Sequence, residues 1–219
     1  MKGLWWKLLG LALILFSVIF GLYGPVPRQP ILNETIRVLY YHVPMWFSMI
    51  AMMLASLIFS IKALRGQDLW SDHKAFEYSK TGFFLASLGL LTGMVWARFT
   101  WGAFWVNDPK LNGTAVTMLI YLAYFVLRSS VDDPEKRSRL AGVYNIFAFV
   151  MMVVFIGILP RLTDSLHPGN GGNPGFNRYD LDSNMRPIFY SAVIGWIIVG
   201  LWISQLRLRL EKLKQSDEE

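Results

Sequence analysis

The sequence predicts an all-α integral membrane protein with six transmembrane helices. Of its 219 residues, 54% are hydrophobic and only 16% are charged, against roughly 25% charged in an average protein. The hydrophobic residues form runs that approach the roughly 20 residues needed to cross a bilayer. Runs of this length indicate helices, because a helix satisfies its own backbone hydrogen bonds in hydrocarbon. We expect residues 1–219 to form one membrane domain.

Six apolar runs follow one another along the chain. The predicted spans cover residues 4–23, 40–61, 81–97, 113–127, 140–159 and 188–206. The first is predicted to stay as a span, because its apolar run exceeds the roughly 7–15 residues of a signal peptide and no small-x-small cleavage site precedes Pro25. The second ends at Lys62 and the sixth at Arg207, where polar sequence begins.

The middle spans carry further signals. Gly89 and Gly93 form a GxxxG pattern in the third span, which predicts close helix packing. The fourth run is shorter than the roughly 17 residues that a span needs, so it is expected to extend into its polar flanks. The fifth follows Arg139, the last of four basic residues in the preceding flank.

Lysine and arginine predict the orientation, because cytoplasmic flanks are richer in these residues. Of the 21 in the chain, 14 lie in one set of flanks. The opposite set holds Arg28, Arg37, Arg98, Lys110, Arg161, Arg178 and Arg186. Both termini belong to the richer set and are predicted to be cytoplasmic. The net charge of +6 therefore reflects topology and does not indicate nucleic-acid binding.

Several classes of protein are disfavoured. The chain has no cysteine, which excludes disulfides, thiolate metal sites and covalent heme attachment through sulfur. Asp, Glu, Lys and Arg are absent from the middle of every span, which argues against ion-coupled transporters and proton pumps. No H-E-x-x-H, Walker A or Gly-x-Ser-x-Gly sequence occurs, so we do not expect an enzyme.

The predicted outer face gathers two of the three histidines. His42 lies at the start of the second span, and His167 lies in an outer loop predicted over residues 160–187. The tryptophan-rich segment, residues 98–112, connects the third and fourth spans on the same face. His73 is alone on the cytoplasmic side and is expected in a solvated loop.

This arrangement suits a metalloporphyrin. Heme iron takes axial ligands above and below the ring, and neutral imidazole is a common one. Trp101 and Trp105 could pack against the porphyrin. Arg37 and Lys110 are the cations nearest in sequence to His42 and to the tryptophan-rich segment, so they are the candidates for pairing with propionates.

Two other functions stay open on these residues alone. Tryptophan at a membrane interface commonly belongs to an aromatic belt, which would fit a permease subunit for another substrate. A membrane enzyme that uses a histidine pair for quinone or lipid chemistry is the third possibility. A heme protein absorbs visible light, whereas the permease would be colourless.

Residues 101–111 resemble the tryptophan-rich signature of the heme-handling protein family, Trp-Gly-x-x-Trp-x-Trp-Asp-x-x-Leu-Thr. The matching positions are Trp101, Gly102, Trp105, Asp108 and Leu111. Asn107 stands in place of the third signature tryptophan, and Asn112 stands in place of the threonine. His42-Val-Pro is similar to the first external histidine of that family, although Trp46 comes one residue early. Six spans and a single pair of outer histidines resemble the CcmC branch.

The resemblance implies a role in c-type cytochrome maturation at the bacterial cytoplasmic membrane. A CcmC-type protein would bind a b-type, non-covalently held heme in transit at the outer face, with His42 and His167 on the iron. It would pass the heme to the chaperone CcmE. The resemblance also implies the ABC-type subunits CcmA and CcmB and the small membrane protein CcmD as partners.

Overall fold

The computed structural model describes residues 3–29, 31–168, 175–176 and 181–217. Six helical stretches within these residues are long and apolar enough to cross a membrane, which confirms the predicted six-span, all-helical class. Parts of the predicted outer loop 160–187 lie outside the described residues. The elements are α1 (Trp5–Tyr23), the 3₁₀ helix η1 (Asn33–Val38), α2 (Leu39–Gly66), α3 (Leu69–Trp101), α4 (Pro109–Ser129), α5 (Pro134–Met152), the π-helix η2 (Val153–Ile158), α6 (Leu159–Leu162) and α7 (Met185–Asp217).

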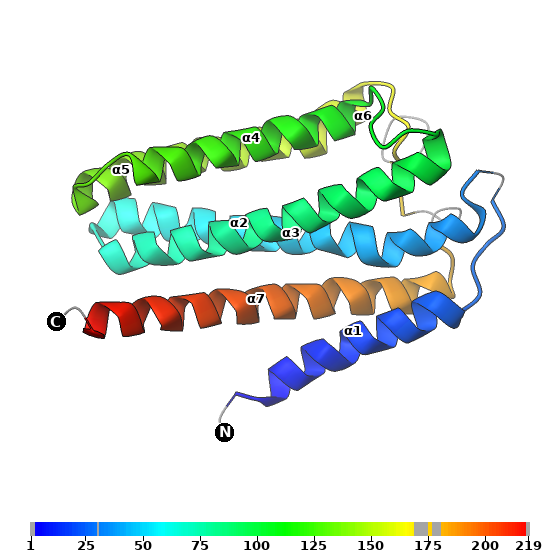
Figure 1. Cartoon of the computed structure of the whole chain (residues 1–219), viewed down its shortest axis with the longest axis horizontal. Helices are drawn as coiled ribbons and strands as arrows, with labels where there is room; N and C mark the ends of the chain where they lie inside the picture. Colours follow the sequence, from blue (N-terminus) through cyan, green and yellow to red (C-terminus); the bar gives the residue numbers. More distant parts are fainter. Residues whose placement is uncertain (1–2, 30, 169–174, 177–180, 218–219) are drawn as a thin grey trace.

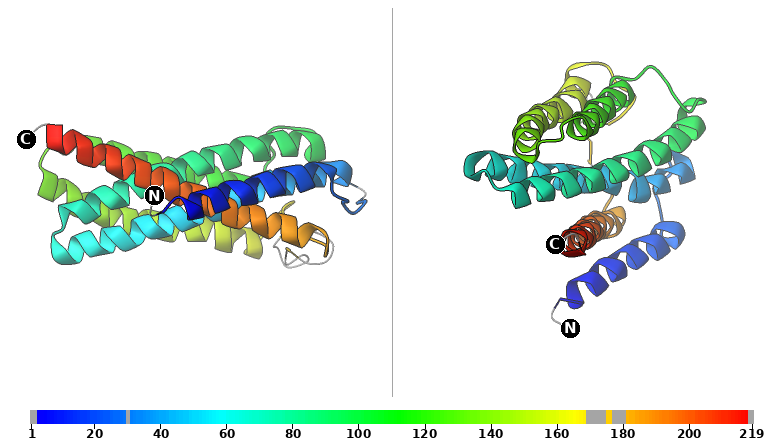
Figure 2. Two further views of the ribbon diagram at one scale, coloured as in Figure 1. Left: turned by 90° about the horizontal axis from the view of Figure 1, so that it is seen from below. Right: turned by 60° about the vertical axis from the view of Figure 1, so that its left-hand side comes forward.

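The helices pack in three layers (Figures 1 and 2). α4 and α5 form one outer layer, α2 and α3 form the middle layer, and α7 with α1 covers the opposite side. α2 is central, because it packs against α3, α5 and α7. The C-terminus lies at one end of the bundle, which we call the terminal end, and the N-terminus lies in the same half of the molecule. His42 and His167 lie at the other end, which we call the histidine end.

The terminal ends of two helices reach well beyond the predicted spans. α3 begins at Leu69 rather than at residue 81, and α7 continues to Asp217 rather than stopping at residue 206. The helices are longer than the predicted spans because charged residues continue them and find partners. Asp72 and Arg128 form a buried bidentate pair at 2.6 and 2.7 Å, and Arg207 Nε donates to Glu77 at 2.7 Å.

His73 was wrongly predicted to lie in a loop. It belongs to the first turns of α3, with its ring tilted against Trp70 and its Nδ1 3.6 Å from a carboxylate oxygen of Glu211 on α7. Asp68 starts this helix as its N-cap, since its carboxylate accepts from the Trp70 N–H. The hydrogen bond from the Ser71 hydroxyl, together with that from the Trp70 N–H, holds the pKa of Asp68 below its usual value.

The fifth span contains a wide turn at the histidine end. η2 continues α5, and α6 follows it directly with Pro160 in its first turn. Proline has no N–H and its ring clashes with the carbonyl four residues earlier, so an ordinary α-turn is disfavoured just before it. Gly113 of α4 packs on this turn, since a Cβ there would lie 2.4 Å from the carbonyl oxygen of Phe155. α4 starts at Pro109, which confirms that the short fourth run extends into its polar flank.

The predicted close packing at the GxxxG pattern is confirmed. A Cβ on Gly89 would lie 2.9 Å from Trp46 Cε2, and a Cβ on Gly93 would lie 2.5 Å from His42 Cε1. The two glycines therefore let α3 approach α2 where these two side chains cross the interface. His42 is fixed against the backbone of α3 as a result.

Candidate functional site

A cavity of about 400 Å³ lies at the histidine end, within the usual size range of a small-molecule site. Its walls come from α2, the outer half of α3, the start of α4 and the η2 turn. Both His42 and His167 line it, so the fold brings the two predicted ligands to one space. Most of the remaining lining is apolar and includes Val43, Trp46, Leu90, Met94, Leu111 and Ile156.

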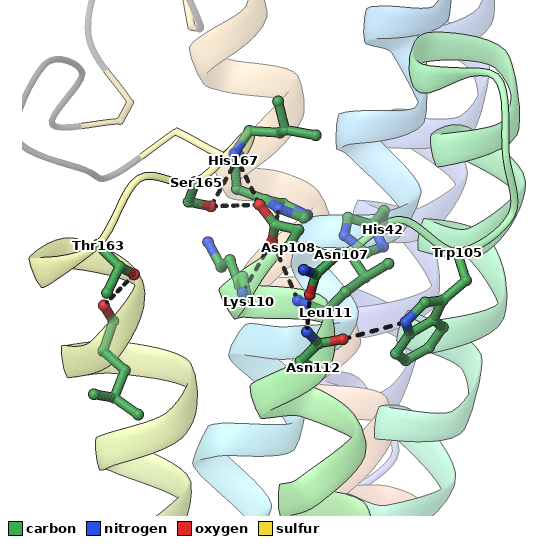
Figure 3. A network of polar contacts seen from close by, with 12 residues as sticks. His42, Trp105, Asn107, Asp108, Lys110, Leu111, Asn112, Thr163, Ser165 and His167 are labelled. Carbon is green, nitrogen blue, oxygen red and sulfur yellow. Dashed lines mark hydrogen bonds and ion pairs between the residues drawn. The ribbon is translucent and has the colours of Figure 1, made fainter.

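His167 is held by Asp108 (Figure 3). Its Nδ1 lies 2.9 Å from Asp108 Oδ1, and its own backbone N–H donates to the Ser165 hydroxyl. A carboxylate only accepts, so Nδ1 of His167 carries a proton, and in the neutral imidazole Nε2 keeps its lone pair. Among the residues that the structure describes, Nε2 has no hydrogen-bond partner. This is the orientation of a histidine prepared to bind a metal through Nε2.

Asp108 organises the whole segment. It is the N-cap of α4, with Oδ1 accepting from the N–H groups of Lys110 and Leu111, while Oδ2 accepts from Ser165 and from the Leu166 N–H at 2.8 Å. Burial acts to raise the pKa of this carboxyl, but these hydrogen bonds and the one from His167 outweigh burial and hold the pKa far below its usual value. Asp108 is therefore a carboxylate at any physiological pH.

His42 is buried between two tryptophans. Its Nδ1 lies 2.9 Å from the Gly89 carbonyl oxygen, which can only accept, so Nδ1 again carries the proton. Its Nε2 accepts from Trp46 Nε1 at 3.3 Å. The rings of Trp46 and Trp96 meet the imidazole edge-on, at centroid distances of 6.0 and 5.9 Å. His42 thus differs from His167 in what its Nε2 contacts.

The tryptophan-rich segment contacts His167 through Trp101 and Asp108, and Lys110 and Leu111 near its end line the cavity. Trp101 is the last residue of α3 and packs its ring edge-on against His167 at 4.9 Å. Gly102 ends α3 with φ of +84°, a left-handed conformation that glycine adopts at low cost. Trp105 is 40% exposed, and its Nε1 donates to Asn112 Oδ1 at 3.2 Å. Asn112 in turn donates to Asn107 Oδ1 at 2.8 Å, so the two residues that depart from the signature are bonded to each other.

Among the described residues, two cations line the cavity, Lys110 and Arg161. Lys110 was predicted, whereas Arg161 was not singled out. Arg37 does not line the cavity, because its guanidinium donates to the carbonyls of Gly21 and Gly24 and pairs with Glu34. Arg161 follows the η2 turn and donates to the carbonyl of Gly157. The cavity therefore pairs two imidazoles and mainly apolar walls with a cationic rim.

Comparison with known proteins gives one family. The family model of CcmC, heme exporter protein C, matches residues 2–219. The chain belongs to the CcmC family. It is 26% identical to heme exporter protein C of Rhodobacter capsulatus over 216 residues, which cover 94% of this chain and 86% of the relative. It is 22% identical to heme exporter protein C of Escherichia coli over 209 residues, which cover 94% of this chain and 81% of the relative.

The six apolar helices and the family together make this chain a multi-pass protein of the bacterial inner membrane. The CcmC family resemblance inferred from the sequence is confirmed. Sequence reasoning missed Trp46 and Trp96 as neighbours of His42, and it missed Arg161. The signal for Trp46 was its spacing, because a residue four positions after His42 lies on the same helix face.

Proposed function

We propose that this chain binds heme non-covalently in the cavity at the histidine end, with the Nε2 atoms of His42 and His167 as axial ligands. One observation carries the proposal. Two imidazoles from different elements line the same apolar cavity, and in each the Nδ1 proton is already donated to a fixed acceptor. In the neutral form of each imidazole, Nε2 holds the lone pair that iron requires.

The other lining groups suit the rest of the porphyrin. Leu111 and the apolar side chains around it would contact the ring, and Lys110 and Arg161 would pair with the propionates. Arg161 would thus pair with a propionate, the role that sequence proximity suggested for Arg37. Asp108 would act through His167, since a hydrogen bond to a carboxylate strengthens an imidazole as a ligand. The iron would supply exchangeable coordination bonds. The chain would orient the heme, surround it with mainly apolar walls and pair its charges.

The histidine end would face outward and both termini would face the cytoplasm, as the distribution of lysine and arginine predicts. At that face the exposed side chains of Phe104 and Trp105, in the same segment as Trp101 and Gly102, form the surface that would present heme to the chaperone CcmE. CcmA, CcmB and CcmD are the partners proposed from family membership. Release follows when an incoming ligand replaces one of the two histidines on the iron.

The experiment is purification of the chain from cells that make heme, with absorption spectra of the pure protein and of a His42→Ala, His167→Ala double variant. The chain should show a Soret band that the double variant lacks, at equal helix content by circular dichroism. Mixing with heme-free CcmE should move the pigment to CcmE. A colourless chain would favour a permease for another substrate, and pigment retained by the double variant would refute the axial assignment.

A further inference from the structure

The two imidazoles are anchored with unequal strength. Nδ1 of His167 donates to the buried, ionised carboxylate of Asp108 at 2.9 Å, whereas Nδ1 of His42 donates to the neutral carbonyl of Gly89 at the same distance. A charged acceptor places more electron density on the imidazole than a neutral one does. The Nε2 atom of His167 is therefore the better donor to a metal.

The Nε2 atoms of the two histidines also differ in the hydrogen bonds that they accept. Nε2 of His42 accepts from Trp46 Nε1 at 3.3 Å, while the described residues offer no such donor to Nε2 of His167. Trp46 follows His42 by four residues on α2, so both side chains lie on one helix face and both line the cavity. The indole is held there by α3, which approaches it closely at Gly89.

We propose that Trp46 is a displaceable cap on the axial nitrogen of His42, which makes His42 the exchangeable ligand and His167 the anchor. This inference rests on the proposed heme function and adds the order in which the two iron bonds break. The imidazole nitrogen has one lone pair, which serves either the indole N–H or the iron. Binding to iron breaks the Trp46 hydrogen bond, and loss of the iron bond restores it.

No proton is transferred in this exchange. Trp46 keeps its Nε1 proton and His42 keeps its Nδ1 proton on the Gly89 carbonyl, so one coordinate bond forms as one hydrogen bond breaks. A hydrogen bond of this kind is worth about 0.5–1.5 kcal/mol net, which corresponds to roughly a 2- to 10-fold bias against the His42 bond to iron. The iron face that opens first is the face toward His42, while His167 still holds the heme.

The test is Trp46→Phe, which keeps an aromatic ring and removes the N–H. In heme-loaded protein, displacement of the axial histidine by added imidazole, followed by stopped-flow absorption, should be about 2- to 10-fold slower than in the unaltered chain. Trp96→Phe is the matched control. Trp96 also meets His42 edge-on, but its Nε1 donates to Thr35, so this variant should slow the exchange less than Trp46→Phe does.

An exchange rate in Trp46→Phe that equals or exceeds the unaltered rate, or equal slowing in Trp96→Phe, overturns the cap. A second measurement leaves Trp46 in place: His42→Ala should retain more heme through purification than His167→Ala, because the anchor remains. Equal or reversed retention also overturns the inference. If the unaltered chain carries no heme, the proposed function itself has failed, which is a different result from heme-loaded protein without the asymmetry.

Discussion

Replacing Asp108 with Asn tests whether the carboxylate sets the strength of the His167 ligand. Asn is as good an N-cap as Asp, and one amide oxygen still accepts from His167 Nδ1 and the first turn of α4. The charge is lost. In the unaltered chain the Leu166 N–H donates to Asp108 Oδ2 at 2.8 Å, and the amide NH₂ of the variant cannot accept this hydrogen bond. The change therefore acts mainly on the loop that carries His167 and on the electron density of its ring.

The expected loss follows from the hydrogen bond to a metal ligand. Mutation of such a partner typically weakens metal binding about 10- to 100-fold, which is about 1.4–2.7 kcal/mol. Heme titration of the purified variant, followed at the Soret band, measures the dissociation constant directly. Asp108→Ala should lose more and also lower the thermal midpoint, because loss of an N-cap alone costs about 0.5–2 kcal/mol.

Asp133→Asn is the matched control. Asp133 is the N-cap of α5 at the terminal end, where its side chain accepts from the Lys136 N–H, and its position is remote from both ligands. Heme affinity in this variant should equal that of the unaltered chain. If Asp108→Asn also binds heme with unchanged affinity, the view that Asp108 strengthens His167 as a ligand is wrong.

Three further predictions follow from the same geometry. Gly93→Ala places a Cβ 2.5 Å from His42 Cε1, so the imidazole must move and heme titration should show at least a tenfold loss, while helix content by circular dichroism is kept. Lys110→Ala and Arg161→Ala should each weaken binding of heme several-fold but leave binding of heme dimethyl ester unchanged, because the ester has no propionate charge to pair; an equal loss with the ester would contradict this role. Because the folded pKa of Asp108 is depressed, its stabilising contribution is complete above the unfolded value of about 3.9 and is lost as pH falls below that value. In urea unfolding, the free energy of unfolding of the unaltered chain should therefore exceed that of Asp108→Asn by a constant amount from pH 8 to pH 5, and the difference should shrink below about pH 4. A difference that already shrinks near pH 6 would contradict a depressed pKa for Asp108.

Much of the fold was accessible from hydropathy, because a bilayer requires long apolar helices. The ends of α3 and α7 were not, since the buried pair of Asp72 and Arg128 joins residues that are far apart in sequence. A hydropathy run stops at such charges, whereas the helix continues once each charge meets its partner. The partners of a charge depend on tertiary packing, which a single sequence does not show.

The candidate site also has residues that the sequence indicated and residues that only tertiary packing brings to it. His42 and His167 were chosen from residue type and topology and Asp108 from the family signature, and the structure brings His167 and Asp108 into direct contact. Arg37 was chosen because it is near His42 in sequence, but five residues along a helix lead to nearly the opposite face, and its guanidinium turns to the end of α1. Arg161 reaches the cavity only because the η2 turn brings the end of the fifth span there.

The most direct test of the central claim is the electron paramagnetic resonance spectrum of the ferric, heme-loaded chain. Two histidine ligands predict a low-spin, six-coordinate signal, and His42→Ala and His167→Ala should each convert the heme that remains bound to a high-spin form. Added imidazole should restore the low-spin signal in both variants. A high-spin spectrum in the unaltered chain, or a low-spin spectrum that survives either replacement without imidazole, would contradict ligation by His42 and His167.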